Sequence, residues 1–109
     1  MAEGLNEEEL AIFDILTRPD PTLTKKEEAE VKKVARTLLE TLKREKLVLD
    51  WRVRQQSRAA VRQAIEITLD TLPEVYTGDI YERKCDLTYH HIYDCYCGQG
   101  QSVYQQVAR

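Results

Sequence analysis

The stretch LVLDWRVRQQSRAAVRQAIEITLDTL, residues 47–72, decides the fold that we expect for this chain. Asp50 is a residue type that commonly caps helix N-termini, and the sequence from Trp51 to Leu72 contains no glycine or proline. We therefore predict a helix of about six turns, which begins after Asp50 and ends before Pro73. The other predicted helices pack around it.

Arginines share one side of this predicted helix with aliphatic residues. At about 100° per residue, the arginines lie within roughly a quarter-turn of the aliphatic side chains. The arginines are Arg54, Arg58 and Arg62, and the aliphatic residues are Val61, Ile65, Leu69 and Leu72. This side therefore changes from basic to apolar along the helix, and we interpret its arginines as a candidate partner-binding or phosphate-binding site.

An alternative interpretation is that these arginines are paired inside the domain. A buried arginine without a partner would be costly, so any arginine that faces inward should have one. The candidate partners are acidic residues of the last predicted helix, namely Asp79, Glu82, Asp86 and Asp94. Trp51 is expected in the core or at its rim.

The composition is that of one soluble globular domain. The chain has 109 residues, of which 42% are hydrophobic and 32% charged. A net charge of −3 argues against the whole domain being a nucleic-acid binder, which would need at least a local basic patch. No apolar run approaches the ~20 residues that span a membrane, so we expect a cytoplasmic protein. In that compartment we expect the three cysteines to be reduced thiols.

Three further helices are predicted from capping signals. Asn6 with Glu9, and Thr24 with Glu27, are capping-box patterns that place helix starts after Asn6 and Thr24. We expect the first helix to stop before residue 18 and the second to cover residues 25–46. A fourth helix, capped by Thr77, should run to about Tyr96 and be ended by Gly98 at its C′ position. The predicted fold is an all-α, single-domain bundle of about four helices over residues 1–109, with a short C-terminal tail.

Two sequence patterns resemble catalytic motifs without their structural setting. Pro19-Asp20, followed by Glu30-Val31-Lys32, spells a pattern of metal-dependent nucleases, but residues two apart diverge on the helix predicted here. Gly98-Gln99-Gly100 resembles part of a phosphate loop, but it follows a helix, whereas a phosphate loop precedes one. We predict no catalytic residue in this chain.

Cysteine and histidine residues gather in the last predicted helix, where His91 and Cys95 have the i, i+4 spacing of a zinc pair. There is no C-x-x-C pair, and small cysteines in helices are usually core residues. We therefore favour a structural role and no metal site for the group, which comprises Cys85, His90, His91, Cys95 and Cys97.

From Gly4 to Tyr104 the chain resembles the C-terminal domain of the motor and restriction (R) subunit of type I restriction-modification enzymes. The resemblance is carried by the Leu-x-x-x-Glu-Leu-Ala opening at residues 5–11, by Asp50-Trp51 with Arg58-Ala59 downstream, and by the segment 89–104. That segment contributes Tyr89, His91, Tyr93, Gly98, Gly100 and Tyr104.

The resemblance implies a parent protein that is an ATP-dependent DNA translocase and endonuclease using ATP and Mg²⁺. The resemblance also implies that the nuclease and helicase-like domains lie upstream, and this chain itself holds no G-x-x-x-x-G-K-[ST] loop. The fragment itself is expected to be no enzyme and to need no cofactor. Its helical domain would join the motor to the methyltransferase and specificity subunits and would meet DNA through the parent complex.

Two hypotheses follow for this domain. The first is a subunit-docking module whose arginine-bearing surface binds a partner protein. The second is an auxiliary DNA-contacting module, whose phosphate ligands would be Arg54, Arg58 and Arg62, with Lys43, Arg44 and Lys46 as further candidates.

Overall fold

The computed structural model describes residues 5–18, 21–47, 50–98 and 101–102. Within these residues the helices are α1 (Glu7–Thr17), α2 (Lys25–Thr41), α3 (Gln55–Leu69) and α4 (Gly78–Cys95), and the short π-helix η1 (Leu42–Lys46) continues α2. A short antiparallel pair, β1 (Tyr96–Gly98) and β2 (Gln101–Ser102), follows α4. The predicted all-α fold is confirmed.

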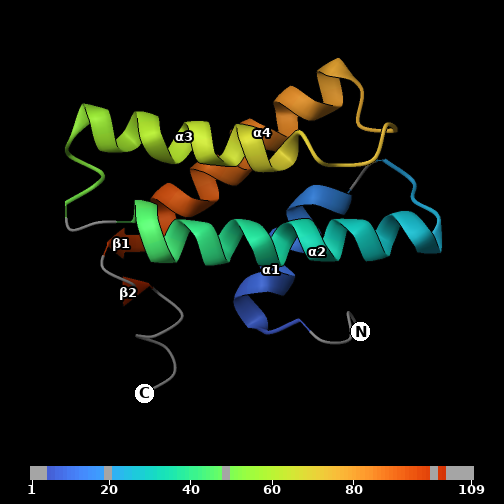
Figure 1. Ribbon diagram of the computed structural model, residues 1–109, viewed down its shortest axis with the longest axis horizontal. Helices are drawn as coiled ribbons and strands as arrows, with labels where there is room; N and C mark the ends of the chain where they lie inside the picture. The colour runs from blue at the N-terminus through green and yellow to red at the C-terminus, as the bar shows by residue number, and fades with distance from the viewer. Residues whose placement is uncertain (1–4, 19–20, 48–49, 99–100, 103–109) are drawn as a thin grey trace.

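The helices form one packed bundle, shown in Figure 1. Helices α2 and α3 run antiparallel side by side, and α4 crosses behind them. Helix α1 packs against both α2 and α4. As a result, each end of α4 lies close to elements that are distant in the sequence.

The starts of α1 and α2 follow the sequence prediction. Both capping boxes form: Asn6 Oδ1 accepts from the Glu9 amide at 2.8 Å, and Thr24 Oγ1 accepts from the Glu27 amide at 3.1 Å. The reciprocal bonds, from the cap amides to the two glutamates, are 3.2 and 2.9 Å. Helix α1 ends at Thr17, and the second helical segment reaches Lys46 through η1, so these boundaries are confirmed.

The predicted start of the arginine-bearing helix was wrong. Asp50 has a φ of 60° and lies in a turn closed by the Val53 amide, which donates to the Asp50 carbonyl at 3.1 Å. Helix α3 begins only at Gln55, with Arg54 at its N-cap position, and it ends at Leu69. The turn forms because Trp51 is fully buried and donates from Nε1 to the Tyr96 carbonyl at 3.1 Å.

The predicted end of the fourth helix also needs correction. Tyr96 is already extended, and Gly98 lies in β1 opposite Gln101, not at a helix C′ position. The Tyr96 side chain is fully buried and its hydroxyl donates to Glu8 at 2.8 Å, which turns the chain away from the helix. The expected C-terminal tail, from Val103 onward, lies outside the described residues.

The core lies where the apolar faces of the helices meet. Val61, Ile65 and Leu69 of α3 are buried against α2 and α4 as predicted, while Leu72 is half-buried. The inner face of α4 consists of Cys85, Thr88 and Ile92, which are buried, and Tyr81, which is half-buried, and buried Tyr96 follows just beyond the helix. Trp51 is a core residue, as expected.

The C-terminal end of α1 is closed by side chains from other parts of the chain. Lys84 is fully buried and donates from Nζ to the carbonyls of Ile15 and Arg18, both at 2.9 Å. The Tyr76 hydroxyl donates to the Leu16 carbonyl at 2.7 Å. The last turn of α1 has no basic residue of its own, so Lys84 brings positive charge to the negative end of the helix dipole.

Candidate interaction surface

The turn before α3 is anchored by aromatic packing. The Trp51 ring meets the rings of Tyr89 and Tyr93 edge-on, with centroid distances of 6.4 and 5.8 Å. Edge-to-face packing of this kind adds to the stabilisation that burial provides. The turn at residues 50–54 is therefore fixed against α4 in one orientation.

Two arginines are held by backbone carbonyls in this region. Arg52 donates from Nη1 to the Tyr93 carbonyl at 2.9 Å, and its guanidinium lies 5.5 Å from the centre of the Tyr93 ring. Arg58 donates from Nη1 to the Arg52 carbonyl at 2.7 Å. Neither arginine forms an ion pair with an acid in the part of the chain that the structure describes. Both side chains are thus oriented while their positive charges stay uncompensated.

Arg62 is different, because it is paired with acids. It contacts Glu66 at 2.9 Å and Asp86 at 2.8 Å, and its guanidinium lies 6.0 Å from the centre of the Tyr89 ring. Burial alone would lower the pKa of Arg62, but the bonds to Glu66 and Asp86 outweigh it and raise that pKa. Internal pairing through Asp86 is therefore confirmed for Arg62. Within the described residues, Arg54, Arg58 and Arg62 form no ion pair with Asp79, Glu82 or Asp94.

Arg54 is exposed and makes no side-chain hydrogen bond or ion pair with any described residue. Next to it Val53 has 76% of its surface exposed, and Tyr93 has 37%. We call the surface formed by Arg52, Val53, Arg54, Arg58 and Tyr93 the arginine face. It combines uncompensated positive charge with exposed apolar surface.

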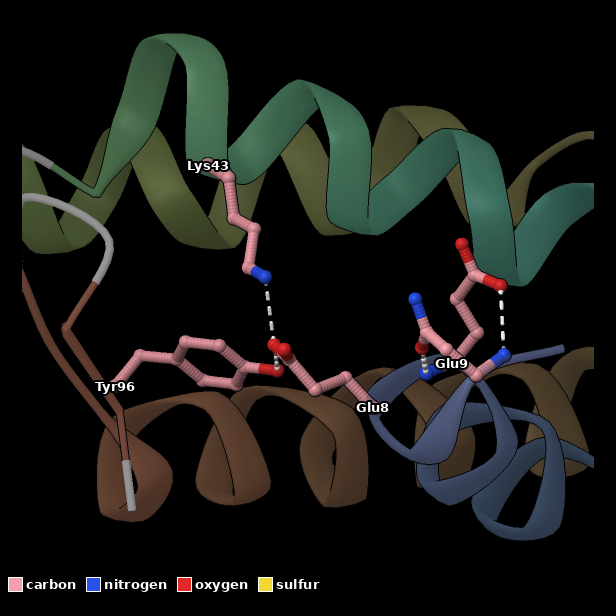
Figure 2. Close-up of polar contacts among 5 residues, drawn as sticks. Glu8, Glu9, Lys43 and Tyr96 are labelled. Carbon is pink, nitrogen blue, oxygen red and sulfur yellow. Dashed lines mark hydrogen bonds and ion pairs between the residues drawn. The ribbon is translucent and has the colours of Figure 1, made fainter. Parts of the chain in front are cut away.

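The additional basic residues of the DNA-contacting hypothesis are largely paired. Lys43 contacts Glu8 at 2.7 Å, and the same carboxylate accepts from the Tyr96 hydroxyl, as Figure 2 shows. Arg44 lies 3.1 Å from Glu45 and 3.9 Å from Glu40. Lys46 is half-buried. The ion-paired residues have less free charge to offer phosphates than the sequence alone suggests.

The nuclease-like pattern lies on a helix as far as the structure describes it. Glu30 and Lys32 are both in α2, where residues two apart point in divergent directions, and Pro19 and Asp20 lie outside the described residues. Of the phosphate-loop-like glycines, Gly98 is in β1, paired with Gln101, and not at a helix N-terminus, while Gly100 lies outside the described residues.

The cysteine and histidine group is split between faces of α4. Cys85 is buried and His90 is exposed, while Cys95 Sγ lies 3.7 Å from His91 Nδ1. Burial raises the pKa of both Cys85 and Cys95. The pKa of His91 is lowered overall, because the effect of burial outweighs the opposite effect of the nearby Asp94 carboxylate. Among the described residues, which exclude the Cys97 side chain, no three His, Cys, Asp or Glu residues are grouped to hold a metal ion.

Sequence reasoning missed Arg52, Val53 and Tyr93 as members of the surface. A signal was present, because Val53 is an aliphatic residue between two arginines, but the expected helix gave it no special role. The contact between Arg52 and Tyr93 joins residues 41 positions apart, so only the folded structure reveals it.

The chain is thus a small all-α domain with an exposed surface, the arginine face, that is basic and partly apolar. None of the helices described is long and apolar enough to cross a membrane. The family model described as Type I restriction enzyme HindI endonuclease subunit-like, C-terminal, matches residues 1–91, and the chain belongs to this family.

The family match confirms the resemblance read from the sequence. It ends at residue 91, so it includes the Asp50-Trp51 step and the arginines but not the segment from residue 92 to Tyr104 that also contributed to the resemblance. No curated protein and no solved structure matches the chain.

Proposed function

We propose that this domain docks the endonuclease subunit of a type I restriction enzyme onto its methyltransferase and specificity subunits, and that the arginine face is the docking surface. Family membership supports a place in a multi-subunit restriction enzyme. Arginine and tyrosine are enriched at the energetic centres of protein interfaces, and the arginine face presents both beside exposed Val53.

One observation carries the proposal: the N-cap position of α3 is occupied by Arg54, which makes no capping hydrogen bond. Helix N-termini favour Asp, Asn, Ser or Thr, and a positive charge there opposes the helix dipole. Helices α1 and α2 of the same chain follow that rule with full capping boxes. Thr77 at the N-cap of α4 also makes no side-chain capping bond, but it is a favoured residue type, so among the described α-helices only α3 has an unfavoured residue at its N-cap. An exposed position that breaks a local rule is typical of a functional site.

The test is co-purification of the 109-residue chain with the methyltransferase–specificity core, comparing the wild type with Arg54→Asp. Arg54→Asp reverses the charge on the arginine face while supplying a good helix cap, so the domain stays folded. We expect its Kd for the core to rise at least about tenfold, a loss of about 1.4 kcal/mol.

The matched control is Lys33→Glu, which makes the same change in charge on the exposed side of α2. The control variant should bind like the wild type. Equal binding by Arg54→Asp and the wild type would contradict the proposal. Loss of binding in Lys33→Glu as well would show that net charge matters and the arginine face does not.

The ATP and Mg²⁺ chemistry that the family suggests is proposed to belong to other parts of the parent enzyme. The residues of this chain do not fit either group: the sequence has no G-x-x-x-x-G-K-[ST] loop, and the described residues hold no cluster of three metal-binding side chains. The DNA-contacting alternative remains a prediction, and its signature would be salt-sensitive binding of duplex DNA by the chain alone.

A further inference from the structure

The arginine face is a positively charged surface region of a chain whose net charge is negative. Residues 51–65 contain four arginines and no Asp or Glu, namely Arg52, Arg54, Arg58 and Arg62, whereas the whole chain has a net charge of −3. Arg62 is neutralised by Glu66 and Asp86, which leaves three arginines without an acidic partner in the described structure. Opposite charge on a binding partner would compensate them.

The uncompensated charges have a defined spacing. Arg54 and Arg58 are one helical turn apart at the start of α3, so their Cβ atoms are separated by roughly 6 Å. Arg58 is fixed by its bond to the Arg52 carbonyl, and Arg52 is fixed by its bond to the Tyr93 carbonyl. Because Arg52 and Arg58 are already ordered, a partner that pairs with Arg58 loses less side-chain entropy on binding.

Apolar surface at the same place distinguishes a protein partner from a nucleic-acid backbone. Val53 is 76% exposed between Arg52 and Arg54, and the exposed part of Tyr93 adjoins Arg52. Phosphates and sugars would leave Val53 uncovered, whereas an aliphatic side chain of a protein partner would bury its apolar surface, which is favourable. The pairing of Lys43 and Arg44 with glutamates further limits a phosphate track.

We infer that the arginine face receives an acidic segment of a partner protein, in which carboxylates pair with Arg54 and Arg58 while an apolar side chain covers Val53. Arginine forms paired hydrogen bonds with carboxylates, which gives such a contact orientation as well as attraction. This inference rests on the proposed docking function and adds to it the chemistry of the surface that docks.

Zero-length cross-linking with a carbodiimide tests the inference. In complex with the methyltransferase–specificity core, Arg54→Lys places an amine where the guanidinium was, and the carbodiimide joins that amine to a carboxylate only if the two are in contact. We expect mass spectrometry to find a new cross-link between the introduced lysine and an Asp or Glu of the core. The natural Lys33, on the exposed side of α2, serves as the internal control and should form no such link.

Salt dependence and a Val53 variant complete the test. Raising NaCl from about 0.05 M to 0.5 M should weaken wild-type binding at least about tenfold. At the higher salt concentration, the attraction between opposite charges is screened beyond a distance of a few ångströms. Val53→Ser should weaken binding by a smaller factor and leave the salt dependence unchanged. A loss of salt dependence in Val53→Ser would contradict the apolar role that we assign to Val53.

The outcomes separate the two proposals. If the chain forms a complex whose stability is insensitive to salt and whose introduced lysine forms no cross-link, the acidic partner is wrong while docking stands. If the chain binds duplex DNA and not the core, both proposals fail. If no complex with the core forms under any condition, both fail as well.

Discussion

The C-terminal end of α1 and the N-terminal end of α3 are completed in opposite ways. At the end of α1, carbonyls accept from the buried Lys84 and from Tyr76, and no residue of the helix itself provides the needed positive charge. At the start of α3, the N-cap residue Arg54 forms no cap and adds positive charge to the positive end of the dipole. The carbonyls at the end of α1 have hydrogen-bond donors within the domain, while the start of α3 would be stabilised by a negatively charged partner.

This difference separates residues that hold the domain together from residues available to another molecule. Lys84 is fully buried, and its amine donates to the Ile15 and Arg18 carbonyls inside the domain. Arg54 is exposed and its charge is committed to no described residue. Changes at Lys84 should therefore affect the stability of the domain, whereas changes at Arg54 should affect its binding to a partner.

Lys84→Met should produce the largest loss of folding stability. The substitution keeps an unbranched side chain in the core but removes the donor to the Ile15 and Arg18 carbonyls, so we expect unfolding to become easier by about 2–4 kcal/mol. Urea denaturation measures this as a lower midpoint at similar slope. Lys33→Met, at an exposed position of α2, is the control and should shift the midpoint little. A similar small shift for Lys84→Met would contradict the role of the buried amine.

Arg54→Asp should change stability in the opposite direction. An aspartate at this position can accept from the free amides of the first turn of α3 and also favours the helix dipole. We expect the free energy of unfolding to rise by about 0.5–1 kcal/mol, in the same variant that should lose binding to the core. Thermal unfolding provides the measurement, and a lower midpoint would show that Arg54 stabilises the domain in a way not visible in its contacts.

The pH dependence of stability should show the smallest effect and should come from His91. Burial lowers the pKa of His91, so the unfolded chain takes up a proton more readily than the folded domain as pH falls. Stability contributed by neutral His91 is therefore present above its unfolded pKa and is lost as pH falls through about 6.5.

His91→Gln should flatten the decline in unfolding free energy between about pH 7.5 and 5. His90→Gln is the matched control, because His90 is adjacent in the sequence and exposed. Denaturant titrations across this pH range would reveal the change in slope. Unchanged slopes in His91→Gln would argue that burial does not keep this ring neutral.

Local signals predicted much of the fold. The capping boxes at Asn6 and Thr24 and the apolar spacing of the helices depend on residues three or four positions apart, so they can be read directly. The turn at Asp50 could not be read this way, because it depends on Trp51 reaching the Tyr96 carbonyl 45 residues away. The role of Lys84 depends on the carbonyl of Ile15 in α1, 69 residues away, and on that of Arg18 just beyond α1, 66 residues away.

The candidate surface was predictable only in part. The sequence identified Arg54, Arg58 and Arg62 as a group and Asp86 as one of four possible acidic partners. The crossing of α3 and α4 brings Asp86 to Arg62, while Arg58 binds a carbonyl exposed by the unexpected turn. Helical periodicity describes neither the crossing nor the turn, so it could not separate the paired arginine from the unpaired ones.

Amide hydrogen exchange of the chain, alone and bound to the methyltransferase–specificity core, tests docking through the arginine face most directly. We expect slower exchange on binding in residues 51–58 and around Tyr93, with no change in α1, whose contacts are made within the domain. Protection of α1 and α2 without protection of residues 51–58 would contradict docking through this face.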